Sequence, residues 1–569
     1  MLTWFDADPS RYWSVAWGTF AVFIAVAVGP VLAGFRSDKV EQRSLRWLPP
    51  WLFIAASSVC FVAFRWPLWF VTYEFNVDES QMLSEALTLL RDPVFWRSVD
   101  GATHGPLDVY PLWSVRLVGL NLDYLGARLL GAAMIWLVII ACYRAFASFA
   151  RESLARVAVV PVFCFFAFTT FSDFVHYSSE HVPLVLVTAG FCLFAGELVH
   201  FESRTVRSAR WIFAGLLVGG VPMAKLQAVP IAIALLVSAT VFECLLPGLT
   251  WPNRLKRVLV LAAASLTPTA FFAVISVFWG VGHHAWISYV IQNLEYAGTA
   301  HFTQAEMVTT FWSYVRKCEN LFPFLIGCIA VGSLSLMPAL CASRAALRIV
   351  GFAVVFLVSS LVAALAPGRQ FFHYLLFIIA PAGLLAGGVW LSSWQAVEPL
   401  PRTRVLRAWL LITLFAATIY PQISARVVQP HPYVGSLTPR IALSSQPVAA
   451  EILRHAQSGE RLGLWGWGGR YHVETQMTQA TRDSNSFHQI VNSPLTDYYR
   501  TRYLRDFTRQ PPPVFVDTVG PSDPSFNHRE SQAHETFPEF KAYIENHYKQ
   551  IAEINGCRIY VRLDRLPQR

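Results

Sequence analysis

The sequence is short of charged residues, and this shortage excludes an entirely soluble protein. Only 14% of its 569 residues are Asp, Glu, Lys or Arg, whereas about a quarter of a soluble globular chain is charged. The deficit comes from long apolar blocks, and the stretch after Tyr420 has the composition of a soluble domain. We therefore expect one membrane domain followed by one smaller soluble domain.

Two further absences exclude other classes of protein. The net charge of +9 is dispersed over short segments between apolar blocks, so the sequence has no basic arm of the kind that binds nucleic acid. Of the nine cysteines, only Cys318 and Cys557 lie away from apolar segments. At most one disulfide is therefore expected, which excludes a small secreted fold held together by disulfides.

The sequence has many apolar runs that are long enough to cross a bilayer. About 20 apolar residues span the hydrocarbon core as a helix. The first run lacks a small-residue cleavage site, so we expect it to be retained as a helix. About twelve spans are predicted, at residues 13–34, 48–71, 127–147, 155–172, 183–200, 210–223, 226–246, 258–280, 320–342, 349–366, 371–394 and 408–424.

Basic residues predict which side of the membrane each loop occupies. Loops between alternate spans carry clusters of Arg and Lys, the first of them within residues 36–46. The positive-inside rule places these loops in the cytoplasm. Both termini and the long loops 72–126 and 281–319 are then expected outside. The predicted domains are a membrane domain at 1–424 and an extracytoplasmic α/β domain at 425–569.

The external loop and the tail also carry secondary-structure signals. Residues 79–90 have their apolar side chains on one helical face, which predicts a helix lying in the membrane interface. Glycines 466, 468 and 469 lack the spacing of a phosphate-binding loop, so the tail is expected to cover or shape a site in the membrane domain. Its predicted elements are helices at Pro447–Gln457, Ser493–Phe507 and Phe537–His547, strands at Arg461–Trp467 and Val514–Val519, and a hairpin at 548–562 around Asn555-Gly556.

Acidic residues stand at the external ends of two predicted spans. Asp78 and Glu79 follow the second span, and Glu180 opens the fifth. Carboxylates at the membrane surface are costly to desolvate, so they are expected to have either a charged partner or a functional role. One of them could act as a general base that accepts a proton from a hydroxyl. Acidic side chains also favour the first turn of a helix, where Asp78 could serve as the cap. Spacing alone leaves both interpretations open.

Basic residues lie near the same predicted face. Lys225 separates two apolar segments, and either reaches outward to water or binds an anion. Arg369 occupies a very short external turn, against the positive-inside rule, and its guanidinium suits a phosphate partner that His373 could share. His104, in the first external loop, is either structural or functional. Carboxylates together with cations suit transfer of a group from a lipid phosphate to an alcohol.

These motifs, in this order, resemble the lipid-linked-sugar glycosyltransferases of the C-type fold (GT-C). The resemblance is to the protein-mannosyltransferase and aminoarabinose-transferase branch and its rhizobial galacturonosyltransferase-like relatives. The sequence departs from the pattern at Gly105, where members of the family often have a second proline. The likeness rests on Asp78-Glu79, His104-Gly-Pro-Leu107, Ser179-Glu180, Lys225, Arg369 before Tyr374-Leu-Leu and Pro381, and Trp465-Gly-Trp-Gly with Ala480-Thr-Arg482 in the tail.

The resemblance implies a polytopic α-helical protein of the bacterial inner membrane with a periplasmic C-terminal α/β domain. It also implies inverting transfer of a sugar from a polyprenyl monophosphate to a hydroxyl acceptor, a glycolipid or polysaccharide rather than a protein. The implied residue roles are Asp78 as the base, Glu79 and Glu180 in its support, Lys225, Arg369 and His373 at the donor phosphate, and His104 and Tyr374 at the substrate.

Two questions stay open at this point. No nucleotide or other cofactor is called for, but a divalent metal near Asp78 is neither required nor excluded by one Asp-Glu pair. A transporter or flippase for a lipid-linked sugar would also need phosphate-binding cations. Transporters commonly show internal repeats, and no clear repeat is present in the sequence.

Overall fold

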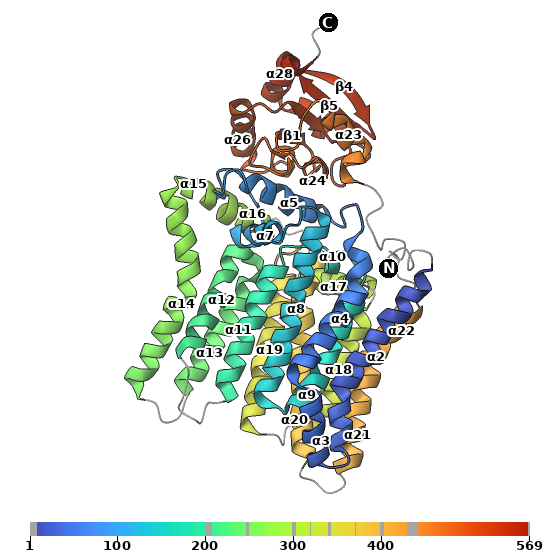
Figure 1. Cartoon of the computed structure of the whole chain (residues 1–569). Helices are drawn as coiled ribbons and strands as arrows, with labels where there is room; N and C mark the ends of the chain where they lie inside the picture. Colours follow the sequence, from blue (N-terminus) through green and yellow to red (C-terminus); the bar gives the residue numbers. More distant parts are fainter. Residues whose placement is uncertain are drawn as a thin grey trace.

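The computed structural model describes residues 8–199, 208–245, 250–298, 303–318, 320–339, 343–369, 371–398, 403–428 and 442–566. Long helices form a bundle, and a small α/β domain covers one end of it (Figure 1). The layer where the two parts meet contains the shorter helices α5 (Val77–Leu89), α7 (Trp113–Leu117), α15 (Gly282–Ala285) and α16 (Gln292–Gly298).

Each of the twelve predicted spans coincides with a helix. The chain is a polytopic helical membrane protein, as the sequence predicts. The helices are α2 (Pro9–Gly34), α4 (Pro50–Trp69), α8 (Tyr124–Phe149), α9 (Glu152–Phe168), α11 (His181–Val199), α12 (Ser208–Ala224), α13 (Val229–Leu245), α14 (Trp251–Phe278), α18 (Leu321–Ala339), α19 (Arg344–Leu365), α20 (Leu376–Val397) and α21 (Thr403–Leu414), which continues through η6 (Phe415–Ile419) into α22 (Tyr420–Val428).

The number of full-length spans is smaller than the number of helices. Within the described residues, nine helices are long and apolar enough to cross a membrane, or ten if the bent pair α17 (Gln304–Lys317) and α18 counts as one span. α9 and α12 have 17 residues each, which is about 26 Å against a core of about 30 Å. α9 is buried along nearly its whole length, so protein surrounds it rather than lipid.

Burial distinguishes the central helix from the peripheral ones. In α20, 94% of the most apolar stretch is buried, whereas in α14 the figure is 11%. α20 packs against α18, α19 and α9. This central helix is enclosed on nearly every side, and η5 (Phe372–Leu375) leads directly into it.

The loop between α4 and α8 forms a buried helix, and not the interfacial helix that its sequence pattern predicts. α5 (Val77–Leu89) has eleven buried residues. It contacts α8 of the bundle on one side, and α24 (Arg470–Thr475) and β2 (Thr478–Gln479) of the tail on the other. The amphipathic pattern arises because one face meets the apolar loop core and the other meets polar groups of the tail.

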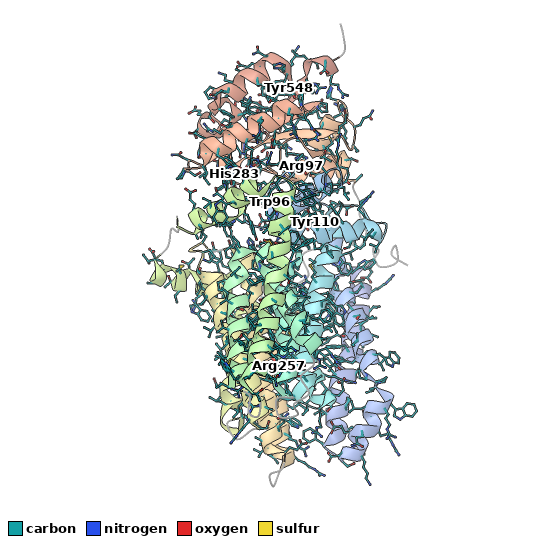
Figure 2. The ribbon with its side chains drawn as sticks, turned by 90° about the vertical axis from the view of Figure 1, so that its left-hand side faces the viewer. Trp96, Arg97, Tyr110, Arg257, His283 and Tyr548 are labelled. Atoms are coloured by element: carbon teal, nitrogen blue, oxygen red, sulfur yellow. The ribbon has the colours of Figure 1, made fainter. Side chains whose placement is uncertain are left out.

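The segment after α14 also folds into short helices near the tail. It contains α15 (Gly282–Ala285), η4 (Trp286–Ile291) and α16 (Gln292–Gly298). Figure 2 shows His283 and Arg97 at the level where the bundle meets the tail, while Arg257 lies towards the opposite end of the bundle. The basic loop at the start of α14 and the tail are therefore at opposite ends, as the charge pattern predicts.

The tail is an α/β domain with a five-stranded sheet in the order β2-β1-β3-β5-β4. β1 is parallel to β2 and β3, β3 is antiparallel to β5, and β4 and β5 form the predicted hairpin. Asn555 and Gly556 both have positive φ, which the tight hairpin turn requires. The elements are α23 (Pro447–Leu453), β1 (Arg461–Trp465), α24, β2, α25 (Phe487–Ile490), α26 (Thr496–Arg509), β3 (Val514–Asp517), α27 (Arg529–Gln532), α28 (Pro538–His547), β4 (Tyr548–Ile554) and β5 (Cys557–Arg562).

Candidate functional site

A cavity of about 440 Å³ lies where the bundle, the loops that follow α4 and α14, and the tail meet. The start of α5, the helix α16, the segment before α20, and the helix α25 with neighbouring loops of the tail all contribute to its lining. Five of the eight sequence-predicted site residues line it, namely Asp78, Lys225, Arg369, His373 and Tyr374.

Asp78 occupies the first turn of α5 and faces the cavity. The helix cap is the preceding Asn76, whose Oδ1 accepts the Asp78 N–H at 3.0 Å. Asn76 Nδ2 in turn donates to Asp173 Oδ1 at 2.6 Å. The Asp78 side chain is 32% exposed, and its Oδ2 lies 4.0 Å from His373 Nε2. Capping is therefore supplied by Asn76, and the Asp78 carboxylate is directed into the cavity.

Glu79 points away from the cavity and into the protein. Arg128 of α8 holds both of its carboxylate oxygens, with Nε–Oε1 at 2.8 Å and Nη2–Oε2 at 2.9 Å, and both side chains are fully buried. Arg128 also donates to the backbone carbonyls of Val71 and Tyr73, each at 2.6 Å. This buried pair fixes the chain between α4 and α5, and thereby the position of Asp78.

Three carboxylates surround the His373 side chain. It lies in η5 (Phe372–Leu375), just before α20, and is buried. Besides Asp78, its ring nitrogens lie 3.6 Å from Asp173 Oδ1 and 3.9 Å from Glu180 Oε1. Burial would raise the pKa of Asp173, but His373 and Asn76 lower it more, so that pKa lies below its ordinary value. His373 therefore links three acidic groups at the floor of the cavity.

Lys225 is a fixed cation in the cavity wall. It is the extended residue between α12 and the short turn η3 (Leu226–Ala228) that leads into α13. Its Nζ donates to Ser179 Oγ at 2.6 Å and forms a buried ion pair with Glu180. The same Nζ lies 5.2 Å from the centre of the Tyr374 ring. Because these contacts hold the ammonium beside the cavity, Lys225 does not reach outward to water.

Arg369 supplies a second cation to the same cavity. Its guanidinium carbon lies 4.0 Å from the centre of the Tyr296 ring in α16, a cation–π contact that orients the planar group. Arg369, Tyr296 and Tyr374 all line the cavity. Two cations and the Asp78 carboxylate thus face one enclosed space.

A second hollow of about 240 Å³ adjoins the first and is mostly apolar. The two share Thr103, Lys225, Tyr296 and Tyr374 in their linings. The Lys225 ammonium therefore stands where a polar hollow meets an apolar one. Such a junction suits a molecule with an anionic group attached to a hydrocarbon chain.

His104 lies beneath the cavity and does not line it. Its Nε2 is 2.7 Å from Glu85 Oε2 of α5, and both groups are buried. Burial would lower the pKa of His104, but attraction by Glu85 raises it above its ordinary value. The next residue, Gly105, has an N–H that donates to the Ala224 carbonyl at 2.6 Å, and a Cβ there would meet the Met223 carbonyl at 2.2 Å. Glycine at this position therefore lets the loop pack onto the end of α12.

Asp108 completes this buried layer. Both of its carboxylate oxygens lack a hydrogen-bond partner among the described residues, and its side chain is fully buried. Burial raises its pKa well above the ordinary value, against the attraction of His104 and Lys225. The buried surroundings of Asp108 thus disfavour its charged form.

The tail forms the roof of the cavity. Trp467, Phe487 and His488 lie in its lining, and Asn485 Nδ2 donates to Gln81 Oε1 of α5 at 3.2 Å. Further along α5, Gln479 donates to Ser84 Oγ at 2.9 Å through Nε2 and to Thr88 Oγ1 at 3.0 Å through its backbone N–H. Hydrogen bonds from the tail thus reach α5 at three positions along the helix, Gln81, Ser84 and Thr88.

Groups of metal-ligating type occur in two places. In the described part of the chain, Asp517, His534 and Glu535 of the tail have ligand atoms close enough to hold one ion. Arg529 already donates to Asp517 and pairs with Glu535 there, at 3.0 and 3.5 Å. Around His373, Glu180 is held by Lys225 and Asp173 by Asn76. In both places protein cations or donors thus engage part of the ligand set, whereas Glu180 Oε2 and Glu535 Oε2 have no hydrogen-bond partner among the described residues.

Several important residues have only weak signals in the sequence. Arg128 lies inside an apolar run, and Glu85 inside an amphipathic helix, where charged residues are common on the solvent side. Tyr296 and the tail residues Trp467 and Phe487 reach the cavity from segments far apart in the sequence. The signal that could have identified Arg128 is its isolation among apolar residues, because a charge there needs a partner.

Comparison with known proteins gives a fold and no sequence family. No family model and no curated protein matches the chain. Among solved structures, ArnT from Cupriavidus metallidurans bound to undecaprenyl phosphate matches with a TM-score of 0.54 at 13% identity, over 90% of this chain and 98% of that one. The apo state of the same protein matches with a TM-score of 0.52 at 13% identity, over 89% and 98%. The chain therefore has the GT-C fold along nearly its full length, as its motifs predict.

Proposed function

We propose that this protein is an inverting glycosyltransferase that moves a sugar from a polyprenyl monophosphate to a hydroxyl acceptor at the outer face of the inner membrane. The observation that carries the proposal is a single cavity with one directed carboxylate, Asp78, and two fixed cations, Lys225 and Arg369. The binding of undecaprenyl phosphate by ArnT, which has the same fold, supports a donor of this kind.

The donor phosphate is assigned to Lys225 and Arg369. An ammonium and a planar guanidinium on one wall can bind a phosphate together, and Arg can do so with two parallel hydrogen bonds. The adjoining apolar hollow of about 240 Å³ suits the first part of a prenyl chain. Glu180 forms an ion pair with Lys225, and His373 lies 3.9 Å from Glu180. These two residues then serve to position Lys225.

Asp78 is assigned as the general base. Its carboxylate accepts the proton of the acceptor hydroxyl as that oxygen attacks the anomeric carbon of the sugar. A new C–O bond forms on one face of the sugar while the bond to the phosphate oxygen breaks on the other, which inverts the configuration. Lys225 and Arg369 stabilise the negative charge that the leaving polyprenyl phosphate acquires.

Glu79 and His104 are assigned positioning roles in this scheme. Glu79 is buried against Arg128, and His104 against Glu85. Neither lines the cavity. They determine where α5 and the loop after it lie, and so act through Asp78 and Lys225.

The acceptor is proposed to be a glycolipid or a polysaccharide. Trp467 and Phe487 line the tail side of the cavity, and flat aromatic side chains suit the apolar faces of sugar rings. A transporter of a lipid-linked sugar is the competing candidate, since it would use the same cations. Transporter sites lie near the middle of the bilayer, whereas α5 and α16, which line this cavity, lie at the end of the bundle that the tail covers (Figure 1).

The proposed orientation puts the tail outside the cytoplasm. A cysteine in place of Lys541, which is about half-exposed on α28, should react with a membrane-impermeant maleimide on intact cells. A cysteine in place of the exposed Lys256 of α14 should react only after the membrane is permeabilised. The opposite pattern, measured above the wild-type background, would reverse the orientation.

The transfer reaction is tested with the purified full-length protein. We expect a radiolabelled polyprenyl-phosphate sugar, supplied with a membrane lipid extract, to lose its label to an acceptor while free polyprenyl phosphate accumulates. Protein reconstituted into vesicles provides the second measurement. Movement of intact donor across the vesicle membrane without release of polyprenyl phosphate would favour the transporter instead.

A further inference from the structure

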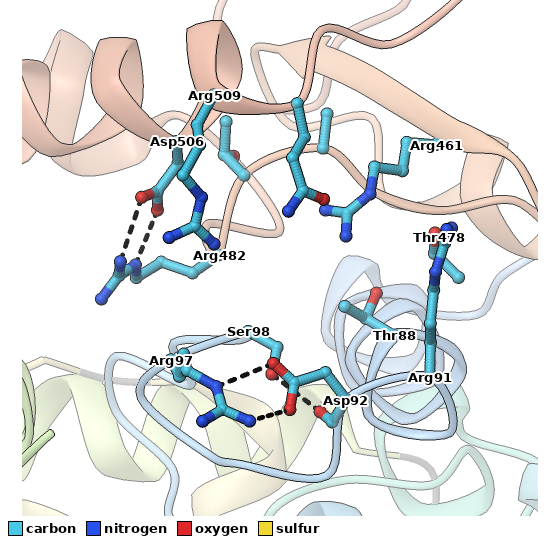
Figure 3. Close-up of a pocket in the computed structure, with 13 residues that line it drawn as sticks. Thr88, Arg91, Asp92, Arg97, Ser98, Arg461, Thr478, Arg482, Asp506 and Arg509 are labelled. Carbon is cyan, nitrogen blue, oxygen red and sulfur yellow. Dashed lines mark hydrogen bonds and ion pairs between the residues drawn. The ribbon is translucent and has the colours of Figure 1, made fainter. Parts of the chain in front are cut away.

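A small pocket of about 60 Å³ lies at the far end of α5 from Asp78, between the loop that follows this helix and the tail (Figure 3). α5 has 13 residues, so the pocket is about 20 Å from the start of the helix. It shares no lining residue with the cavity. Its lining is strongly basic, with five arginines (Arg91, Arg97, Arg461, Arg482 and Arg509) against two aspartates (Asp92 and Asp506).

Both aspartates are already neutralised by arginines of the same pocket. Arg482 binds the two oxygens of Asp506, with Nε–Oδ2 at 2.7 Å and Nη2–Oδ1 at 3.0 Å. Arg97 binds Asp92 in the same two-point manner, with Nε–Oδ2 at 2.9 Å and a second contact through Nη2. Figure 3 shows these two pairs on opposite sides of the pocket. They leave three arginines without an acidic partner.

Those three arginines are Arg91 on the loop side and Arg461 and Arg509 on the tail side. No carboxylate pairs with any of them in the described part of the chain, and Arg91 reaches only the Gly459 carbonyl, at 3.5 Å. Arg461 is partly buried at the start of β1. Burial, together with repulsion from Arg91 and Arg509, holds the pKa of Arg461 below its ordinary value. The pocket therefore carries an uncompensated positive charge.

The donors in the pocket fit one kind of ligand. The nearby hydroxyls are engaged, since Thr88 Oγ1 donates to the Ser84 carbonyl and Ser98 Oγ to the Asp92 carbonyl. Guanidinium groups are thus the free donors, and their planar forks match the oxygens of phosphate. A volume of about 60 Å³ is sufficient for a phosphate-sized anion.

We propose that this arginine pocket is a binding site for a phosphomonoester group, separate from the reaction cavity. Arg91, Arg461 and Arg509 bind the anion, while the paired Arg97 and Arg482 line the site. The rest of the ligand stays outside, because the pocket holds only its charged end. The proposal does not depend on the proposed transferase reaction.

Binding an anion here would strengthen the junction between the tail and the membrane domain. Arg91 belongs to the segment after α5, whereas Arg461 and Arg509 belong to the tail, so the two sides repel each other when the pocket is empty. An anion between them replaces this repulsion with attraction on both sides. Ligand binding is therefore expected to stabilise the closed arrangement in which the tail forms the roof of the cavity.

The test is thermal unfolding of the full-length protein in detergent, with chloride replaced by inorganic phosphate or glucose 1-phosphate at constant ionic strength. A third arm uses nanodiscs with or without phosphatidic acid, which distinguishes a lipid phosphomonoester from a soluble one. All measurements use an Arg369→Gln background, because phosphate is also expected to bind in the cavity. We expect a rise in Tm that saturates with at least one of the three probes.

The double variant Arg461→Gln/Arg509→Gln should weaken that binding at least tenfold. Arg505→Gln, which removes an exposed arginine from the same helix outside the pocket, should leave it unchanged. In chloride alone, the double variant should be at least as stable as its parent, because like charges are removed. Equal responses of the double variant and its parent to all three probes would overturn the proposal, and so would a lower Tm of the double variant in chloride.

Discussion

Replacing Asp78 with Asn should lower sugar transfer by about 10²–10⁴-fold, the range that a general base contributes. Asn is nearly isosteric with Asp but cannot accept a proton from the hydroxyl. The helix cap should survive, since it is formed by Asn76 and the backbone N–H of residue 78. Donor binding should survive too, because Lys225 and Arg369 are unchanged. The measurements are initial rates of transfer and the affinity for the polyprenyl phosphate.

Two results would identify the role of Asp78 more closely. Asp38→Asn, at a 79% exposed side chain of α3 (Asp38–Trp47) at the other end of the bundle, is the matched control and should retain full activity. Full activity in Asp78→Asn would show that another group takes the proton. Loss of donor binding together with transfer would make Asp78 part of the donor site, contrary to the assignment.

Replacing Arg128 with Met should give the largest loss of stability. Arg128 is fully buried and binds Glu79 at two points, so its removal leaves a carboxylate buried without a partner. Breaking one side of a buried pair costs about 3–5 kcal/mol. The two backbone carbonyls that Arg128 also serves would lose their donor. Thermal unfolding of the purified protein measures the effect, and transfer should fall as α5 shifts.

A control and a double variant separate charge burial from simple loss of packing. Arg454→Gln removes an exposed arginine that pairs with Glu451, and should change stability by about 0–1 kcal/mol. Arg128→Met combined with Glu79→Gln should recover part of the lost stability, because no charge then remains buried alone. A double variant less stable than Arg128→Met would mean that the ion pair is not the source of the effect.

The difference between Asp78 and Glu79 illustrates what a sequence leaves undecided. Neighbouring residues of a helix point about 100° apart, so one of an adjacent acidic pair can face a cavity while the other is buried. Residue types predicted the first turn of a helix there, and the structure confirms it. Which carboxylate faces the cavity depends on Arg128, which lies 49 residues further along the chain.

The prediction for residues 79–90 was wrong for a related reason. An amphipathic pattern shows that two faces of a helix meet different surroundings, but it does not identify them. Here the polar face meets the tail through Ser84 and Thr88 rather than lipid headgroups. The contact joins segments almost 400 residues apart, and no local pattern contains it.

The sequence by itself determined those helices and turns that depend only on residues near one another in the chain. Apolar runs fixed the positions of the membrane helices, and Asn555-Gly556 fixed the hairpin because that turn requires positive φ at both residues. The isolated Lys225 and the misplaced Arg369 were predicted as candidate phosphate-binding cations, and both line the cavity. The tertiary structure decided which charges meet. Charges buried at low dielectric must find partners. Those partners are Arg128 for Glu79, Glu85 for His104 and Glu180 for Lys225, and they lie 19 to 49 residues away along the chain, in other elements that only the folded protein brings together.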